Sequence, residues 1–250
     1  MHKQFRSLAE TFLDYFDVDL VTTAKQLQQT GHIRYQVYCA ERGFENPAAF
    51  PDRREIDEFD AHSLHCLISH RRSSRPAGCV RLVCASDADQ LPLEKHCISS
   101  LSPEYTEMLR RKRDGLCEFS RLAVDAAFRK RSSGNHPQNE KLDAMNCSQL
   151  EKRSFSMVGI GSFLAAFALA RLSDRTHIFA MMEANLPRLL RQSGILVQQS
   201  GNYMDYHGQR APFFITTELA LENMREDLRK LYDAVENRLS DCVNTRKRVA

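Results

Sequence analysis

The sequence predicts a mixed α/β (α+β) fold, with a central sheet flanked by helices. Short runs rich in β-branched and aromatic residues alternate with longer stretches whose apolar residues recur every three or four positions. The chain has 250 residues, which is enough to bury one sizeable core. Helices and strands interleaved in this way are typical of layered folds rather than of helical bundles.

The first half of the chain predicts two helices and a hairpin. Apolar side chains between positions 5 and 16 share one helical face, and alternating Phe16, Val18 and Leu20 then predict a short strand. The sequence RRSSRPAG lies between two apolar runs and is typical of a hairpin turn. The expected elements are helices within 2–16 and 24–42, a loop at 43–60, and strands at 64–70 and 77–85.

The second half is expected to complete the sheet around a central strand within 115–125. A polar stretch at 129–155 contains few apolar residues and is expected to be a mobile surface insertion. The other expected elements are helices at 103–113, 156–172, 185–192 and 221–239 and strands at 177–182, 195–199 and 212–217. We therefore predict one domain over 1–216 that contains this insertion, followed by a C-terminal amphipathic helix and basic tail at 217–250.

Composition argues against several classes of function. A net charge of +3 predicts no general attraction to nucleic acid, and the basic clusters lack interleaved aromatic residues. The longest apolar run, 158–172, contains glycines and is shorter than a membrane span. No leader-like pattern is present at the start. The eight cysteines form no CxxC pair, so we expect reduced thiols, no metal site and a cytoplasmic protein.

Two charged residues interrupt the central apolar stretch. Glu118 and Arg121 lie three positions apart in GLCEFSRLAVD, and charges in a buried strand are costly unless they are paired or used. From this stretch alone, a structural ion pair and a functional site remain equally open. Similarly, Gly159 and Gly161 at the start of an apolar helix suit either phosphate binding or tight helix packing.

Four motifs in the first half resemble those of acyl-homoserine-lactone (autoinducer) synthases, in the same order and with compatible spacing. Arg34, Val37, Tyr38, Arg42 and Phe44 resemble R-x-x-V-F-x-x-x-R-x-W, and EIDEFD at 55–60 resembles E-x-D-x-x-D. GCVRL at 78–82 resembles G-x-x-R-L, and EFSRLAVD at 118–125 resembles E-x-S-R-F-A-V-D. Residues 156–161 are similar to the phosphate loop of GNAT acyltransferases, with Ser156 where that loop usually has Gln or Arg.

The resemblance implies a GNAT acyltransferase fold. Within this superfamily, the sequence looks closest to acyltransferases associated with the exosortase/PEP-CTERM sorting system, and it is also similar to N-acyl amino acid synthases. Tyr38 stands where the lactone synthases have Phe, Phe44 where they have Trp, and the insertion follows the central strand directly. Because the aromatic residue at 44 helps form the S-adenosylmethionine pocket in the lactone synthases, these departures point to a different acceptor.

The implied reaction is transfer of a fatty acyl group to an amine of a small acceptor such as an amino acid. The donor would be an acyl-phosphopantetheine thioester, on acyl carrier protein or CoA, with no bound cofactor. Glu118 is the expected base, and a main-chain N–H at a strand bulge is expected to hold the oxyanion. The implied catalytic residues are Glu118, Ser120 and Arg121, the substrate-binding residues are Arg34, Tyr38, Phe44, Asp57, Asp60 and Arg81, and the donor-binding residues are Leu122, Ala123, Val124, Gly159 and Gly161.

Several alternatives stay open. Ser120 either assists the leaving thiol or only packs, and Arg81 and Arg121 either pair with Asp57, Asp60 or Glu118 or contact substrate directly. The basic clusters at 110–113 and 129–131 are docking candidates for an acidic carrier protein, and the C-terminal helix would contact the body or a homodimer partner. The competing functions are an acetyl-CoA-dependent acetyltransferase and a non-catalytic acyl-carrier or lipid-binding protein.

Overall fold

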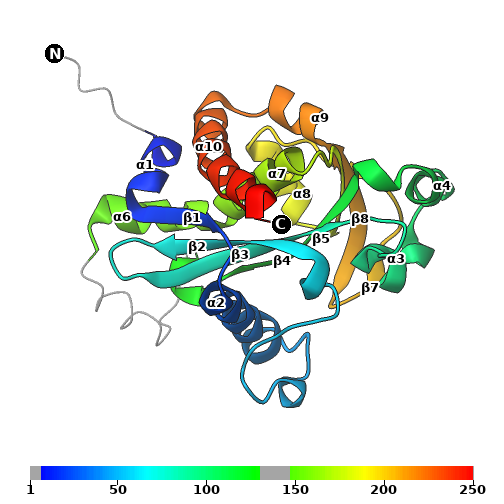
Figure 1. Ribbon diagram of the computed structural model, residues 1–250, viewed down its shortest axis with the longest axis horizontal. Coiled ribbons are helices and arrows are strands. Elements are labelled where there is room, and N and C mark those ends of the chain that lie inside the picture. Colours follow the sequence, from blue (N-terminus) through cyan, green and yellow to red (C-terminus); the bar gives the residue numbers. More distant parts are fainter. Residues whose placement is uncertain (1–6, 130–146, 250) are drawn as a thin grey trace.

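The computed structural model describes residues 7–129 and 147–249, which form an eight-stranded sheet with helices on both faces (Figure 1). The strand order is β1-β2-β3-β4-β5-β8-β6, and β7 also pairs with β8. The strands are β1 (Phe16–Leu20), β2 (Ser63–His70), β3 (Arg75–Cys84), β4 (Leu116–Val124), β5 (His177–Glu183), β6 (Gln198–Gln199), β7 (Met204–Asp205) and β8 (Gln209–Thr216). The mixed α/β prediction is therefore confirmed.

Helices cover the two faces unequally. The long helices α7 and α10 lie over one face, whereas α2 and the shorter α3 and α4 lie over the other. The helices are α1 (Leu8–Tyr15), α2 (Ala24–Arg34), α3 (Pro92–His96), α4 (Pro103–Arg111), α6 (Gln149–Ser154), α7 (Val158–Leu172), α8 (Leu186–Gln192), α9 (Thr217–Glu222) and α10 (Glu226–Val249). A π-helical turn, Tyr35–Glu41, extends α2.

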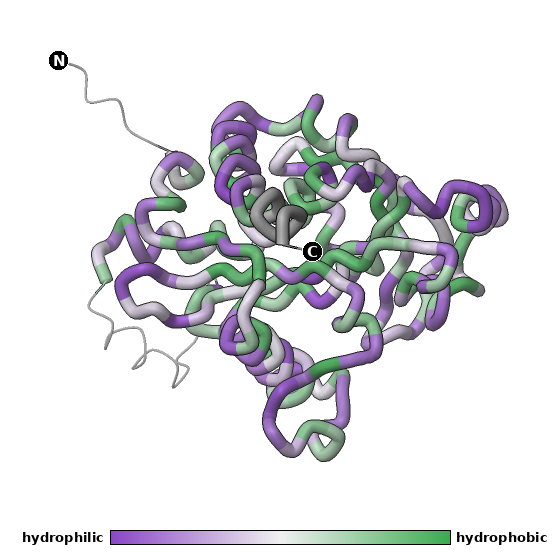
Figure 2. Tube along the Cα trace, in the orientation of Figure 1, coloured by the Kyte–Doolittle hydropathy of each residue, from purple (hydrophilic) through white to green (hydrophobic). Residues whose placement is uncertain are grey.

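The largest core cluster lies between the sheet and α7. Eleven of the fifteen residues of α7 are buried, and apolar residues of α1 and α10 join the same cluster. Figure 2 shows this arrangement as hydrophobic colour along α7 and the central strands, with hydrophilic colour on the outer helix α4. The apolar stripe of α10 is thus buried against the sheet domain. Arg238 on the same helix also forms ion pairs with Asp17 and Asp19 of β1.

The helical stretch Gln149–Leu172 is long and apolar enough to cross a membrane by length and composition. In the fold, 67% of its most apolar window is buried inside the protein. It therefore serves as a core helix of the sheet domain.

Two sequence predictions about this stretch are wrong. Residues 147–155 were expected to belong to a surface loop, but α6 lies within them and Phe155 is buried; positions 130–146 are outside the described residues. The stretch from residue 156 was expected to open a helix with free N–H groups. Instead α6 and a 3₁₀ turn, Phe155–Met157, lead directly into α7, and the N–H of Val158 already donates to the carbonyl of Phe155.

The same geometry corrects the role expected for Gly161. A Cβ atom at this position would lie 2.9 Å from the Cζ atom of Phe12 and 3.6 Å from the Cδ1 atom of Ile68. Gly161 is buried and faces the core between α7 and the sheet, so its missing side chain permits close packing rather than contact with a phosphate. Gly159 is half-buried, and a Cβ atom there would lie 4.0 Å from Val124.

Alanine at these two positions should therefore have opposite effects. We expect Gly161→Ala to destabilise the fold by about 1–3 kcal/mol because it overpacks the fully buried ring of Phe12. Gly159→Ala should be neutral or stabilise by up to about 1 kcal/mol, because the new methyl meets no close neighbour. Denaturant unfolding measures both, and equal losses at the two positions would contradict this account.

Candidate active site

A cleft opens where β4 and β5 part. The two strands are parallel and pair over only three positions, from Leu116 opposite His177 to Glu118 opposite Phe179. Beyond this point the second half of β4 and the end of β5 line a cavity of about 450 Å³. Because β4 pairs with no described strand on this edge after Glu118, main-chain groups beyond it that no side chain engages can face a ligand in the cleft.

A bulge lies in β4 beside this cleft. Cys79 pairs with Ala123 and Arg81 with Ser120, so two residues of β4, Arg121 and Leu122, oppose a single residue of β3. Arg121 has a φ of 50°, which is unusual for a residue with a side chain. The hydroxyl of Tyr38 donates to the carbonyl of Leu122 at 2.7 Å and so ties the end of α2 to the bulge.

Glu118 lies at the head of the cleft and has no cationic partner among the described residues. It is 3% exposed, and its Oε2 atom accepts a hydrogen bond of 2.7 Å from the N–H of Leu93 in α3. Burial raises the pKa of Glu118 to about 8 because the charged form loses hydration, and the Leu93 hydrogen bond offsets only part of this effect. A carboxyl group with such a pKa can take up a proton near neutral pH.

Three arginines and three acidic side chains form a buried network beneath the cleft. Arg34 pairs with Glu55 and with Asp60, the latter at 2.6 Å. Arg81 joins Asp57 and Asp60. Arg121 contacts Glu55 and Asp57, each at 3.1 Å. The network, here called the arginine–carboxylate network, fastens α2 and residues 55–60 to β3 and β4.

Charge pairing in this network outweighs the cost of burial. Burial alone would raise the pKa of Asp57, but the hydrogen bond and charge of Arg81 hold it below its usual value. Burial would likewise raise the pKa of Asp60, and the charges of Arg34 and Arg81 depress it strongly. These carboxylates are therefore ionised at neutral pH, in contrast to Glu118.

The sequence-predicted residues divide into two sets. One set lines the cleft: Glu118, Ser120, Arg121, Leu122, Ala123, Val124, Tyr38 and Phe44. The other, Arg34, Asp57, Asp60 and Arg81, belongs to the arginine–carboxylate network instead of the cleft wall. Of the alternatives left open for Arg81 and Arg121, the structure has both paired with aspartates, and neither is paired with Glu118 among the described ion pairs.

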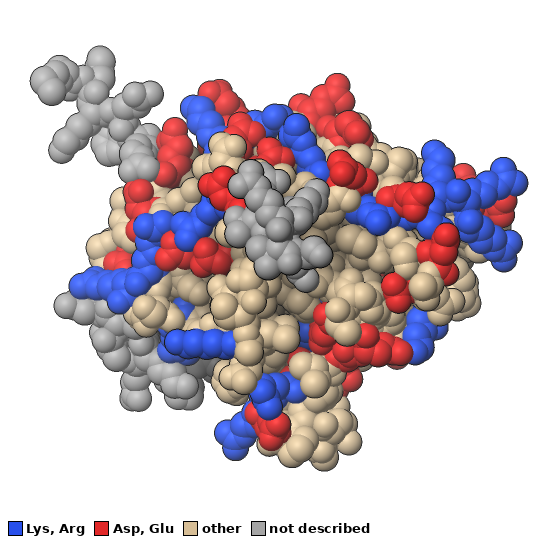
Figure 3. Space-filling model, in the orientation of Figure 1, with Lys and Arg blue, Asp and Glu red and all other residues tan. Residues whose placement is uncertain are grey.

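The two basic clusters lie differently with respect to the cleft. Figure 3 shows basic side chains gathered over α4. This helix precedes the start of β4 in the chain, whereas the second half of that strand lines the cleft. In the second cluster Arg129 lines the cleft, while positions 130 and 131 are outside the described residues.

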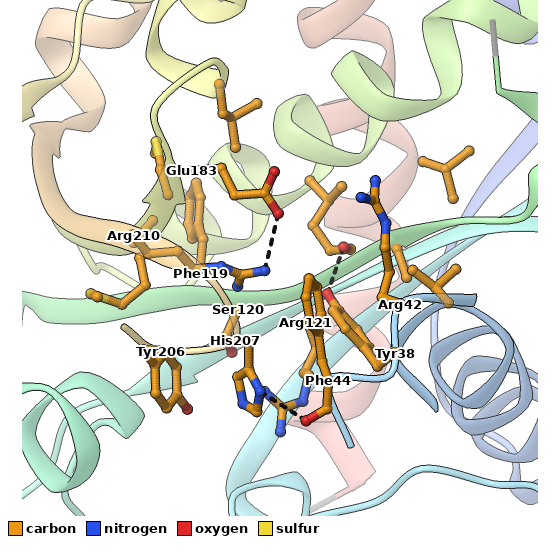
Figure 4. A pocket seen from close by; sticks show the side chains of 18 of the residues that line it. Tyr38, Arg42, Phe44, Phe119, Ser120, Arg121, Glu183, Tyr206, His207 and Arg210 are labelled. Atoms are coloured by element: carbon orange, nitrogen blue, oxygen red, sulfur yellow. Dashed lines mark hydrogen bonds and ion pairs between the residues drawn. The ribbon is translucent and has the colours of Figure 1, made fainter. Parts of the chain in front are cut away.

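Among the residues of the cleft wall that sequence reasoning missed, three polar ones lie close together. Tyr206, His207 and Arg210 come from the turn between β7 and β8 and from the start of β8 (Figure 4). His207 has a φ of 55° and Gly208 of 90°, and the Nδ1 atom of His207 lies 3.0 Å from the carbonyl oxygen of Phe44. The sequence NYMDYHG at 202–208 gave no local signal of this role, because the contact of His207 with Phe44 spans 163 positions.

A His, a Cys and a Glu meet away from the cleft. Ligand atoms of His70, Cys147 and Glu151 lie within 4.8 Å of one another. Glu151 binds His70 at 2.9 Å and also accepts from the N–H of Ser148, while the second ring nitrogen of His70 lies 2.9 Å from Ser73. Because these polar atoms satisfy one another, the arrangement is explained as a buried hydrogen-bonded group.

Comparison with known families agrees with this geometry. Residues 33–135 match the family model described as an acetyltransferase (GNAT) domain. The chain has a GNAT-like fold. Together with the acyltransferases among the solved structures that resemble it, this match supports an acyltransferase. A search of curated proteins found no match.

Solved structures with this GNAT-like fold include synthases of acylated small molecules. BjaI, a CoA-dependent acyl-homoserine lactone synthase solved with SAM and isopentyl-CoA, has a TM-score of 0.57 at 15% identity, over 88% of this chain and 89% of BjaI. FeeM, an N-acyl amino acid synthase from uncultured soil microbes, has a TM-score of 0.54 at 10% identity, over 84% of this chain and 94% of FeeM. The AHL synthase LasI has a TM-score of 0.53 at 15% identity, over 84% and 97%. At these identities the likeness shows a shared fold.

The raised pKa of Glu118 predicts a pH-dependent effect on stability. Between the ordinary pKa of 4.5 and about 8, the folded protein keeps a proton that the unfolded chain has lost. Folding stability from this group is therefore full below pH 4.5 and declines up to about pH 8. Glu118→Gln should raise the melting temperature clearly at pH 9 and little at pH 4.5, with each kcal/mol worth about 2–4 °C.

The matched control is Glu222→Gln, which changes an exposed side chain at the end of α9. Its effect on the melting temperature should be small and similar at both pH values. If Glu118→Gln showed the same melting difference at pH 4.5 and pH 9, Glu118 would have an ordinary pKa in the folded protein.

Proposed function

We propose that the protein is an N-acyltransferase that moves a fatty acyl group from a thioester to the amine of a small acceptor. The observation that carries this proposal is Glu118, a buried carboxyl group with a pKa near 8, at the head of a cleft formed by two diverging strands. A base with this pKa suits an amine acceptor, because an ammonium group must lose its proton before it can attack.

The reaction proceeds by direct attack. Glu118, alone or through a water molecule, takes a proton from the acceptor ammonium, and the amine nitrogen forms a bond to the thioester carbonyl carbon. The resulting oxyanion is held by a main-chain N–H within Leu122–Val124, next to the bulge at Arg121 and Leu122. The oxyanion then re-forms the carbonyl as the C–S bond breaks. The nitrogen, positively charged after the attack, gives up its second proton, and the leaving thiolate takes up a proton. Ser120 accepts a hydrogen bond of 3.0 Å from Arg81, so its own proton is free to be donated to the sulfur or to a water molecule.

The donor is proposed to be an acyl-phosphopantetheine thioester, carried by CoA or by acyl carrier protein. A pantetheine arm is extended and rich in amides, which suits the unpaired edge of β4. The structure of BjaI with isopentyl-CoA supports a thioester in a protein of this fold. Of the two basic clusters, we favour the one containing Arg129 for docking a carrier protein, since Arg129 lines the cleft.

A fatty acyl chain is favoured over acetyl by the apolar inner end of the cleft. Phe119, Phe163, Ala180 and Met182 line the cleft and also a second, smaller cavity behind it. The edge-on contact of Phe119 with Phe167, at 5.0 Å between ring centroids, closes this end with side chains rather than with main chain. An acyl chain entering here would be covered by apolar groups.

The acceptor is proposed to be an amino acid or a similar small amine. Tyr38 and Phe44 line the cleft on the side of the arginine–carboxylate network. FeeM, described as an N-acyl amino acid synthase, supports an acceptor of this kind. The exosortase/PEP-CTERM association, the cytoplasmic location and a homodimer remain predictions of the sequence.

Acyl transfer is tested by intact-mass spectrometry of long-chain acyl carrier protein mixed with the enzyme and a pool of amino acids and amines. We expect loss of the acyl group with formation of an N-acyl product, and about 10²- to 10⁴-fold slower turnover for Glu118→Gln. The rate should increase with pH up to about 8 and then level off, as Glu118 loses its proton.

Acyl-CoA and acetyl-CoA serve as competing donors in the same assay. If acetyl-CoA were the one donor turned over, the fatty acyl proposal would be wrong and the protein would be an acetyl-CoA-dependent acetyltransferase. Saturable binding of the acylated carrier without turnover of any donor would favour the non-catalytic alternative. A Glu118→Gln variant that turns over at the wild-type rate would exclude Glu118 as the base.

A further inference from the structure

Arg210 is a cation of the cleft whose hydrogen-bonding capacity is largely unused. It is the second residue of β8, its side chain is 16% exposed, and its one ion pair within the described residues joins Nη2 to the Oε1 atom of Glu183 at 3.3 Å. Its buried Nε atom donates no hydrogen bond within the described part of the chain. A buried N–H without an acceptor is costly, so this group is suited to a ligand that supplies one.

The partner that Arg210 has is a weak one. Glu183 is 48% exposed at the end of β5, and ion pairs with so exposed a member contribute little to stability. By contrast, Arg121 in the same cleft meets carboxylates of three residues. Unlike Arg121, Arg210 can therefore accept an additional anion without first leaving a buried network.

Aromatic side chains fix the position of Arg210. Its guanidinium carbon lies 5.2 Å from the ring centroid of Phe44, and the ring of His207 lies 5.8 Å from that of Phe44. Figure 4 shows the guanidinium reaching from β8 toward the middle of the cleft, between Phe119 and His207. Contact with an aromatic ring orients the planar guanidinium, which leaves the N–H groups at its edge for a planar anion such as a carboxylate.

We propose that Arg210 binds the carboxylate of the acceptor and thereby selects acceptors that carry both an amine and a carboxylate. The inference rests on the proposed acyl transfer and adds the residue that sets acceptor specificity. The Nε and Nη groups of Arg210 donate to the carboxylate, while the amine of the same acceptor faces Glu118 in the same cleft. Arg210 is in this scheme a specificity-determining residue that takes no part in proton transfer.

The test compares matched acceptors that differ only in the carboxylate. Amino acids and their α-amides are offered with saturating acyl donor to the wild-type protein and to Arg210→Gln and Arg210→Lys. We expect the wild type to use the acid with a kcat/KM roughly 10- to 100-fold above that for the amide. A ratio of this size corresponds to the usual free-energy contribution of a charge-assisted hydrogen bond. Arg210→Gln should remove this preference by raising the KM for the acid toward that for the amide, and Arg210→Lys should restore part of the preference.

The control variant is Arg225→Gln, whose arginine pairs with Asp227 on the surface and does not line the cleft. It should keep the wild-type preference. Equal use of acid and amide by the wild type would overturn the inference while leaving acyl transfer intact. An increase in the KM of the donor instead of the acid in Arg210→Gln would also overturn it, by assigning Arg210 to the donor.

Calorimetric binding without donor separates this inference from the proposed function. If no donor is turned over, the acyl-transfer proposal fails, but binding of the acid and the amide still tests Arg210. Tighter binding of the acid by the wild type, with the difference lost in Arg210→Gln, would support the inference. The absence of any difference between acid and amide would overturn it.

Discussion

The arginine–carboxylate network is the constraint on which the site depends. Arginine stays charged even when buried, so Arg34 and Arg81, each 1% exposed, need ionised partners nearby. Asp57 and Asp60 supply this charge to Arg81 from a segment that precedes β2, and this pairing holds the segment against the sheet. Because the arginines are paired with these carboxylates, Glu118 has no cationic partner among the described residues. Burial favours its uncharged form, and the charges of Arg81 and Arg121 offset only part of this effect.

The cleft combines two walls with different chemistry. The β4 wall contains Glu118, Ser120 and the bulge at Arg121, all held by contacts with β3 and α3. The opposite wall comes from β5 and β8 and contributes Glu183 and Arg210. In the proposed reaction, the reactive groups lie on the β4 wall and the recognition groups lie on the wall next to the β7–β8 turn. Such a division would keep the proposed base fixed while the other wall can differ in its side chains.

The sequence predicted more of the fold than of the candidate site. The apolar residues around Glu118 and Arg121 predicted a strand inside the sheet. Because burial makes charges costly, the two charges indicated either an ion pair or a functional site there. The role of Gly161 was mistaken because a glycine that permits close packing and a glycine that binds phosphate look the same in one sequence. Arg210 and His207 were missed because their importance comes from Phe44, more than 160 positions away, and no local periodicity records such a contact.

The short seam between β4 and β5 has a mechanical consequence. Only three residue pairs join the two halves of the sheet, so the strands already lack main-chain bonds to each other along the remaining length of β4. A small rotation of one half about this seam would widen the gap without breaking a sheet hydrogen bond. The backbone hydrogen bonds therefore do not limit the width of a molecule bound between β4 and β5. The side chains of Phe119, Phe163 and Met182 set that width, so substitution of a few side chains is enough to change it.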